Sequence, residues 1–156
     1  MSKPYTVTRS TTIDAPIAVI HALLTDFHAW TRWSPWEDID PAMSRTYSGP
    51  EAGVGAGYAW EGNKKAGKGT MRITAVTDDR VDVDLHFDKP FPADNQIVFT
   101  LAAVGAGRTE VRWDMHGQLN LMMRVFALVK SMDSLVGPDF EKGLRQLRLA
   151  AESSAA

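Results

Sequence analysis

The stretch Arg80-Val-Asp-Val-Asp-Leu-His-Phe-Asp88 decides the fold, because its side chains alternate strictly between apolar and polar. Successive side chains of a β-strand point to opposite faces of the sheet, so this alternation predicts a strand with one buried and one solvated face. We expect the inner face to carry Val81, Val83, Leu85 and Phe87. The outer face then carries Asp82, Asp84, His86 and Asp88.

Weaker alternation on both sides of this stretch predicts further strands, over 3–13, from Gly57 to a turn at 62–67, and over 69–77, 95–104 and 108–116. On these strands we place an inner face that holds Tyr58, Trp60, Met71, Ile73, Ala75, Phe99, Val111, Trp113 and Met115. Between the first two strands, Asp14 and Pro16 are typical of a helix start, and two short helices are predicted as far as Arg32. The proline-rich stretch 33–56 is expected to be a loop.

The period changes after Gly117, where 119–130 is apolar almost all round and predicts a short buried helix. An apolar stripe at every third or fourth position then predicts a long helix, with Pro138 either at its first position or at an early kink. The stripe consists of Met132, Val136, Phe140, Leu144, Leu147 and Ala151. Because strands and helices do not alternate, the pattern predicts an α+β protein with a mostly antiparallel sheet. One domain is expected over 1–156, with an ordered core at about 4–152.

The composition narrows the function classes. The chain has 156 residues, of which 44% are hydrophobic and 23% charged, which is typical of a folded globular domain and not of disorder. It has no cysteine, so disulfides and thiolate chemistry are excluded. A net charge of −2 argues against a nucleic-acid partner. Since neither a signal segment nor a membrane span is recognisable, we expect a soluble cytoplasmic protein.

Two features that suggest cofactors fail on their context. Gly62-Asn-Lys-Lys-Ala-Gly-Lys-Gly69 approaches a phosphate-binding loop, but Gly69 stands where a Ser or Thr is needed, and a strand pattern follows instead of a helix. The histidines His21, His28, His86 and His116 are expected on solvated surfaces without a third ligand at a suitable spacing. We therefore predict no metal and no cofactor.

Several segments resemble one known family. The stretch His21-Ala-Leu-Leu-Thr-Asp-Phe-His-Ala-Trp-Thr-Arg-Trp-Ser-Pro-Trp-Glu37 and the turn Trp60-Glu-Gly-Asn-Lys-Lys-Ala-Gly-Lys-Gly-Thr-Met71 resemble the polyketide cyclase/dehydrase-like proteins of the START-like (SRPBCC) superfamily. Phe87-Asp-Lys-Pro-Phe91 and Gly137-Pro-Asp-Phe-Glu-Lys-Gly-Leu144 are similar to further parts of it. The likeness covers roughly residues 4 to 152 and says almost nothing about the substrate.

The resemblance implies a helix-grip fold, in which a curved antiparallel sheet of about seven strands surrounds the long C-terminal helix, with two short helices after the first strand. Such folds usually hold a cavity between sheet and helix. Members bind lipids, sterols, polyketides or other apolar molecules, and some cyclise or dehydrate aromatic polyketides without a cofactor. The alternative from the residues alone is a tightly packed core with no cavity.

The candidate ligand-binding residues are the inner-face side chains together with apolar residues of the two C-terminal helices. They are Tyr58, Trp60, Met71, Ile73, Val83, Leu85, Phe87, Phe99, Trp113, Met115, Phe126, Phe140 and Leu144. At the entrance we place Trp36, Tyr47 and Met122, whereas Trp33 is expected to pack beneath the loop. The hydroxyl of Tyr58 and the indole N–H groups of Trp60 and Trp113 either orient a ligand or bond to backbone groups.

Three functions remain open. The first is binding of a hydrophobic small molecule in the cavity, and the second is a cyclase or dehydratase acting in the same cavity. The third is protein interaction through the apolar helix 119–130, which could equally form the contact of a homodimer. The polarity of the cavity discriminates between the first two: an apolar lining favours binding, and two or more neighbouring ionisable groups favour catalysis. No catalytic residue is identified from the sequence.

Overall fold

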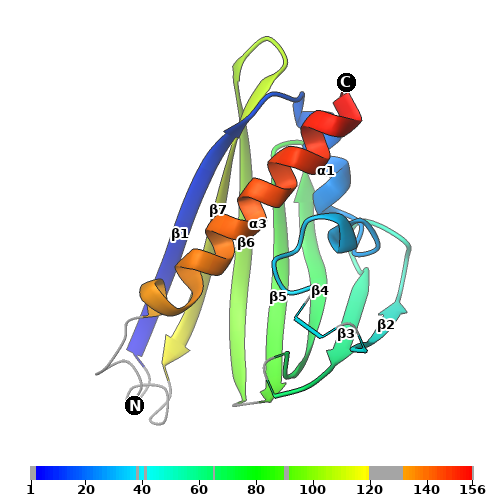
Figure 1. Ribbon diagram of the computed structural model, residues 1–156, viewed down its shortest axis with the longest axis vertical. Helices are drawn as coiled ribbons and strands as arrows, with labels where there is room; N and C mark the ends of the chain where they lie inside the picture. The colour runs from blue at the N-terminus through cyan, green and yellow to red at the C-terminus, as the bar shows by residue number, and fades with distance from the viewer. Residues whose placement is uncertain are drawn as a thin grey trace.

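The computed structural model describes residues 3–37, 39–40, 42–64, 66–89, 92–119 and 132–155. Seven strands, two short helices and one long helix lie in these residues (Figure 1). In chain order they are β1 (Lys3–Ile13), α1 (Ile17–Leu24), the 3-10 helix η1 (Ala29–Arg32), β2 (Ser44–Ser48), β3 (Gly57–Glu61), β4 (Lys68–Thr77), β5 (Arg80–Lys89), β6 (Ala93–Gly105), β7 (Arg108–Leu119) and α3 (Met132–Ala155).

The strands form a single antiparallel sheet in the order β1-β7-β6-β5-β4-β3-β2. Neighbours in the sheet are neighbours in the chain, except that β1 pairs with β7 over its whole length. The long helix α3 crosses one face of the sheet diagonally, and α1 and η1 lie beside it (Figure 1). This arrangement confirms the predicted α+β helix-grip fold with a curved seven-stranded sheet.

The apolar stripe of α3 faces the sheet, as its spacing predicts: Phe140, Leu144, Leu147 and Ala151 are fully or almost fully buried. Pro138 lies inside the helix, beyond its first turn. Arg9 of β1 holds the beginning of α3 through two carboxylates. Its Nη1 lies 2.8 Å from Oδ1 of Asp133, and its Nε lies 3.2 Å from Oε2 of Glu141. The first turns of α3 are thus fixed against the edge of the sheet.

Three details differ from the sequence expectations, and a fourth expectation falls outside the described residues. Strand β2 lies within the stretch that was expected to be a loop. It was not predicted, because its polar, half-exposed residues at the sheet edge lack an apolar alternation. A bulge between Ile73 and Ala75 reverses the phase of β4, so Ala75 is exposed and Val76 packs on the core. Asp14 does not cap α1; its carboxylate pairs with Arg108 instead. The predicted helix 119–130 lies outside the described residues, apart from Leu119 at the end of β7.

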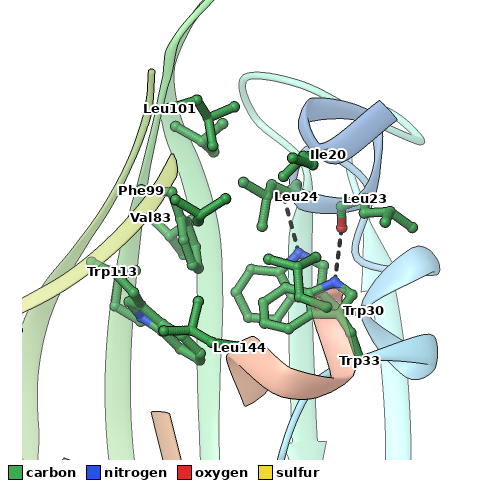
Figure 2. Packing of buried hydrophobic residues seen from close by; sticks show 14 of the residues in the cluster. Ile20, Leu23, Leu24, Trp30, Trp33, Val83, Phe99, Leu101, Trp113 and Leu144 are labelled. Carbon is green, nitrogen blue, oxygen red and sulfur yellow. Dashed lines mark hydrogen bonds between the residues drawn. The ribbon is translucent and has the colours of Figure 1, made fainter. Parts of the chain in front are cut away.

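One end of the space between sheet and helices is filled by aromatic rings. Trp33 meets Phe99 and Trp113 edge-on, with ring centroids 5.9 and 5.6 Å apart. The indole N–H groups of Trp30 and Trp33 donate to the carbonyl oxygens of Leu24 and Leu23, each at 3.0 Å (Figure 2). These carbonyls belong to the last turn of α1, where no helical partner is left. The bonds satisfy the helix end and lock both rings into the core, which confirms Trp33 as a packing residue.

Candidate functional site

The other end of the same interior is hollow. A cavity of about 240 Å³ lies between the sheet, the beginning of α3 and the loop that follows η1. Its wall is mainly aromatic and aliphatic, with a few polar side chains among them. The described residues that line it are Tyr5, Phe27, Trp30, Ser34, Trp36, Glu37, Met43, Tyr58, Trp60, Ala66, Met71, Leu85, Phe87, Ala93, Asn95, Met115, Val136 and Phe140.

The floor of the cavity is one row of paired residues that crosses the sheet. From β1 to β3 the row reads Tyr5, Gly117, Asn95, Leu85, Met71 and Tyr58. Each residue is the direct cross-strand partner of the next, and all but Gly117 line the cavity. The next row toward the packed end reads Val7, Met115, Ile97, Val83 and Ile73, and only Met115 of these reaches the cavity. The boundary between hollow and packed interior therefore falls within two residues along β5.

Gly117 allows two side chains from the strands on either side of β7 to touch across it. Tyr5 on β1 and Asn95 on β6 both pair with Gly117 on β7, and the Tyr5 hydroxyl donates to Oδ1 of Asn95 above it. A Cβ at position 117 would lie 2.6 Å from the Tyr5 hydroxyl oxygen and closer still to the Asn95 oxygen. The absence of a side chain at this position is what places a hydrogen-bonded polar pair in the cavity wall.

Gly69 plays the same part on β4. It pairs with Trp60 on β3 and Phe87 on β5, and these two rings meet edge-on with centroids 5.7 Å apart. A Cβ at Gly69 would lie 2.5 Å from the Trp60 ring. The Trp60 indole N–H donates to the backbone carbonyl of Ala66 at 2.8 Å, which fixes the ring against the hairpin. Trp60 and Phe87 thereby form a rigid apolar wall next to the floor.

A carboxylate enters the cavity from the loop after η1. Both Nε and Nη2 of Arg45 lie 2.8 Å from Oε2 of Glu37, and Nη2 also donates to the Glu37 backbone oxygen at 3.1 Å. The Tyr58 hydroxyl donates to Oε1 of Glu37 over a long 3.4 Å. The Glu37 side chain is only 15% exposed, so its charge is balanced by Arg45 at the edge strand and not by solvent.

Burial keeps the phenols of the cavity neutral. It raises the pKa of Tyr5 to about 12. Burial also raises the pKa of Tyr58, and the negative charge of Glu37 raises it further. A phenol prefers its uncharged form when it is withdrawn from water or placed beside a negative charge. Near neutral pH both hydroxyls are therefore hydrogen-bonding groups without charge.

The structure divides the candidate ligand-binding residues into two groups. Seven of them line the cavity: Tyr58, Trp60, Met71, Leu85, Phe87, Met115 and Phe140. Five others do not, namely Ile73, Val83, Phe99, Trp113 and Leu144, all of which are at most 3% exposed within the packed core. Their expected place in the cavity is corrected, because the rings that descend from η1 fill the space above them. Phe126 lies outside the described residues.

The entrance residues also separate. Trp36 lines the cavity, where its ring meets that of Phe140 edge-on at 6.2 Å. Tyr47 lies outside the wall: its ring stacks on His28 with centroids 3.9 Å apart, and it contacts Tyr58 from behind at 5.4 Å. Met122 lies outside the described residues. Trp36 thus remains the one described residue of the predicted entrance that reaches the cavity.

The three polar groups that the sequence analysis singled out have different surroundings. Trp60 bonds to the backbone and Tyr58 to Glu37. The buried indole N–H of Trp113 has no hydrogen-bond partner in the described part of the chain. Its ring stacks on Phe140 at 4.1 Å, directly behind this residue of the cavity wall. Arg112 and Asp114 pair with each other on the outer face, which confirms the predicted phase of β7.

Sequence reasoning missed the polar groups Tyr5, Asn95 and Glu37. For two of them a signal was present: Asn95 is in phase with the inward Ile97 and Phe99, and Tyr5 is in phase with Val7. A polar side chain in phase with a buried face indicates either a structural pair or a site, and here the two form a hydrogen-bonded pair in the cavity wall. Glu37 follows a proline-rich stretch without any periodic pattern, so no local signal points to it.

One of the four histidines considered as metal ligands, His86, lies on the outer face of the sheet. His86 contacts Asp94 at 2.6 Å and Asp88 at 3.0 Å, and the hydrogen bond to Asp94, followed by the one to Asp88, raises the pKa of its ring. Among the described residues, no group of three side chains is arranged to hold a metal ion. Within the same residues, no helix combines the length and the apolar character that a membrane crossing requires.

Solved structures share this architecture at low sequence identity. A protein of Chromobacterium violaceum is 17% identical, with 94% of this chain and 96% of that chain covered and a TM-score of 0.68. A protein of Thermobifida fusca is 21% identical, with 92% and 90% covered and a TM-score of 0.67. The allergen Ara h 8.0201, a Bet v 1-like protein, is 14% identical over 98% of both chains, with a TM-score of 0.62. At these identities the likeness shows the fold alone.

No functionally curated protein matches the chain in sequence. The model of one protein family does match, over residues 4–152, and it is described as polyketide cyclase / dehydrase and lipid transport. This range takes in every strand of the sheet, the cavity wall and almost all of α3. The chain therefore belongs to the polyketide cyclase / dehydrase and lipid transport family.

Proposed function

We propose that this protein binds a small, largely apolar molecule in the cavity between the sheet and α3. The observation that carries the proposal is the cavity of about 240 Å³ with its mainly aromatic and aliphatic lining. Native interiors are close-packed, so a hollow of this size is an unusual feature. Apolar cavities of about 150 Å³ stay dry and take up benzene. This cavity has about one and a half times that volume, which suits a molecule of two fused rings.

The wall is built to keep its shape without a ligand. Trp60 is fixed by its bond to Ala66, and Trp30 by its bond to Leu24. The loop that carries Glu37 is tied down by Arg45. A preformed apolar site loses little conformational freedom on binding, so ordering the protein costs little of the affinity. For a ligand of ten carbon atoms we expect a dissociation constant on the order of tens of micromolar.

Titration calorimetry with naphthalene tests this proposal, with two neighbouring residues of β5 as a matched pair. Phe87 lines the cavity, whereas His86 points to the outer face. We expect binding with one site per chain, weakened about ten-fold by Phe87→Ala and changed by less than about two-fold by His86→Ala. Equal effects of the two substitutions, or no binding of naphthalene to the unchanged protein, would contradict the proposal.

A second candidate is a cyclase or dehydratase that acts in the same cavity. It is favoured by one observation: Glu37 and Tyr58, two ionisable groups, line the cavity and are in hydrogen-bond contact. A carboxylate can accept a proton from a carbon next to a carbonyl, and a neutral phenol can donate one to a departing hydroxyl. Turnover of model aromatic polyketides that is abolished by Glu37→Gln, with binding retained, would support this candidate. Absence of product over a broad panel would count against it.

A further inference from the structure

The cavity has a polar pair at each end of its floor, and the two pairs differ in chemistry. Glu37 and Tyr58 stand at the β3 end, while Tyr5 and Asn95 stand at the β1–β6 end. Between them the floor is Leu85 and Met71, which offer apolar contact alone. A ligand that lay along this floor would therefore meet polar groups at both ends and apolar side chains between them.

The Glu37 end accepts hydrogen bonds. Oε2 of Glu37 is occupied by Arg45, but Oε1 receives only the long 3.4 Å bond from Tyr58 among the described residues. A carboxylate oxygen can accept two hydrogen bonds, and a bond of 3.4 Å is weak. Because Arg45 already balances the charge of Glu37, a ligand donor at this end needs no positive charge. A neutral hydroxyl group meets the requirement.

The Tyr5–Asn95 end donates hydrogen bonds. The Tyr5 hydroxyl occupies Oδ1 of Asn95, which leaves the amide NH₂ as the group that has no partner among the described residues. Asn95 is only 6% exposed and lines the cavity. This NH₂ is not enclosed by protein atoms, so a ligand oxygen in the cavity can accept its hydrogen bonds. A carbonyl oxygen meets the requirement at this end.

The spacing of the two ends sets the length of the ligand. Three strand spacings separate β6 from β3, which is roughly 14 Å at about 4.8 Å each. The side chains of Asn95 and Glu37 and the two hydrogen bonds to the ligand take up part of this length, so the polar atoms of the ligand stand less than roughly 14 Å apart. Two fused aromatic rings with one substituent at each end have this reach, and they also fit the cavity volume.

We infer that the cavity selects neutral two-ring aromatic compounds that carry a hydroxyl donor at one end and a carbonyl acceptor at the other. The hydroxyl binds Glu37, and the carbonyl binds the Asn95 amide, which Tyr5 holds in position. This inference rests on the proposed function, since it names the ligand class of the same cavity. It also implies that a ligand with a carboxylate at the Glu37 end binds poorly, because two carboxylates offer each other no hydrogen-bond donor.

Four probes on the unchanged protein test the inference by titration calorimetry. They are naphthalene, naphthalene with one hydroxyl group, naphthalene with one acetyl group, and naphthalene with both groups at opposite ends. We expect the hydroxyl group to tighten binding about ten-fold and the acetyl group about five-fold, with the two factors multiplying in the fourth probe. Equal affinity for all four would overturn the inference while the proposed function stands. Failure of all four to bind would overturn both.

Variants then assign each group to its end. Asn95→Leu should remove the advantage of the acetyl group and leave that of the hydroxyl group, whereas Glu37→Gln should reduce the advantage of the hydroxyl group by about ten-fold. Tyr5→Phe, which keeps the ring, should halve the acetyl advantage or more by releasing the amide. Thermal melting shows which variants are folded. A folded Asn95→Leu protein that keeps the acetyl preference would overturn the assignment of that end.

Discussion

Val83 and Leu85 stand two residues apart on β5, on the same face of the sheet, yet one lies in a filled interior and the other at a cavity. Val83 is fully buried and Leu85 is 5% exposed, so their burial hardly differs. What differs is the cover. In the row of the sheet next to Val83, Phe99 and Trp113 are covered by the ring of Trp33. Above the row of Leu85, a loop and the first turns of α3 leave space. Strand alternation thus identifies the inner face, but the covering elements decide where it is hollow.

The largest contrast is expected from removing one phenyl ring at each end. Phe99→Ala would leave a void among Trp30, Trp33 and Trp113 and should lower the free energy of unfolding by about 4 kcal/mol. Phe87→Ala would only enlarge an existing cavity and should cost less than about 2 kcal/mol. Urea unfolding followed by tryptophan fluorescence measures both. Similar losses would mean that the two ends are equally packed.

Adding volume should give the same pattern of sensitivity, with the larger loss at the packed end. Val83→Trp has no space to occupy and should destabilise the fold by about 3 kcal/mol. Leu85→Trp extends into the cavity, so it should change stability by less than about 1 kcal/mol and abolish naphthalene binding. Unfolding and calorimetric titration of the same two samples provide the comparison. A Leu85→Trp protein that still binds naphthalene would show that the ligand lies elsewhere.

A methyl group at Gly117 should act on the polar end of the hollow region. Its backbone does not require glycine, since position 117 is not among those with positive φ, so Gly117→Ala acts through contact alone. The added Cβ would separate Tyr5 from Asn95, and we expect a loss of about 1–2 kcal/mol in the free energy of unfolding.

Tyr5→Phe supplies the control for this effect. If displacement of the Tyr5–Asn95 pair is the cause, the loss from Gly117→Ala should shrink in a chain that already carries Tyr5→Phe. Two fully additive losses would point instead to a strain that has nothing to do with the pair.

The smallest effect concerns the pH dependence of stability. The pKa of Tyr5 is raised to about 12 by burial, above the usual value of 10.0 that it has when unfolded. The folded state therefore holds its proton to a higher pH, and the stability that this provides is complete below pH 10 and declines as pH rises toward 12. Tyr5→Phe should make the decline shallower. An ultraviolet titration in which all tyrosines of the folded protein ionise as they do in urea would contradict this.

Much of the fold follows from the sequence because its decisive signals are local. The alternation from Val81 to Phe87 determines the face and phase of β5, and the stripe of Phe140, Leu144 and Leu147 determines the buried side of α3. The bulge in β4 could not be foreseen, because Thr74 and Ala75 differ too little in polarity to mark the extra residue. Edge strand β2 was missed for the same lack of contrast.

The candidate site is harder to predict from the sequence than the fold, because it depends on which elements cover the sheet. Six of the inner-face candidates and Phe140 of α3 line the cavity, but the same rule also placed Phe99 and Trp113 there. Phe99 and Trp113 do not reach the cavity because Trp30 and Trp33 pack against them. Hydrogen bonds to the end of α1 fix the positions of these two rings. Glu37 reaches the cavity through its ion pair with Arg45 on the unforeseen strand β2, a contact without any sequence pattern.

The most direct test of the account is the position of a bound ligand, measured by nuclear Overhauser effects between naphthalene and the methyl groups of β4 and β5. Leu85 and Met71 line the cavity, while Val83 and Ile73, each two residues away on the same strand, are packed. We expect strong nuclear Overhauser effects from the ligand to Leu85 and Met71 and none to Val83 and Ile73. Equal effects to both pairs, or effects to neither from a ligand that binds, would contradict it.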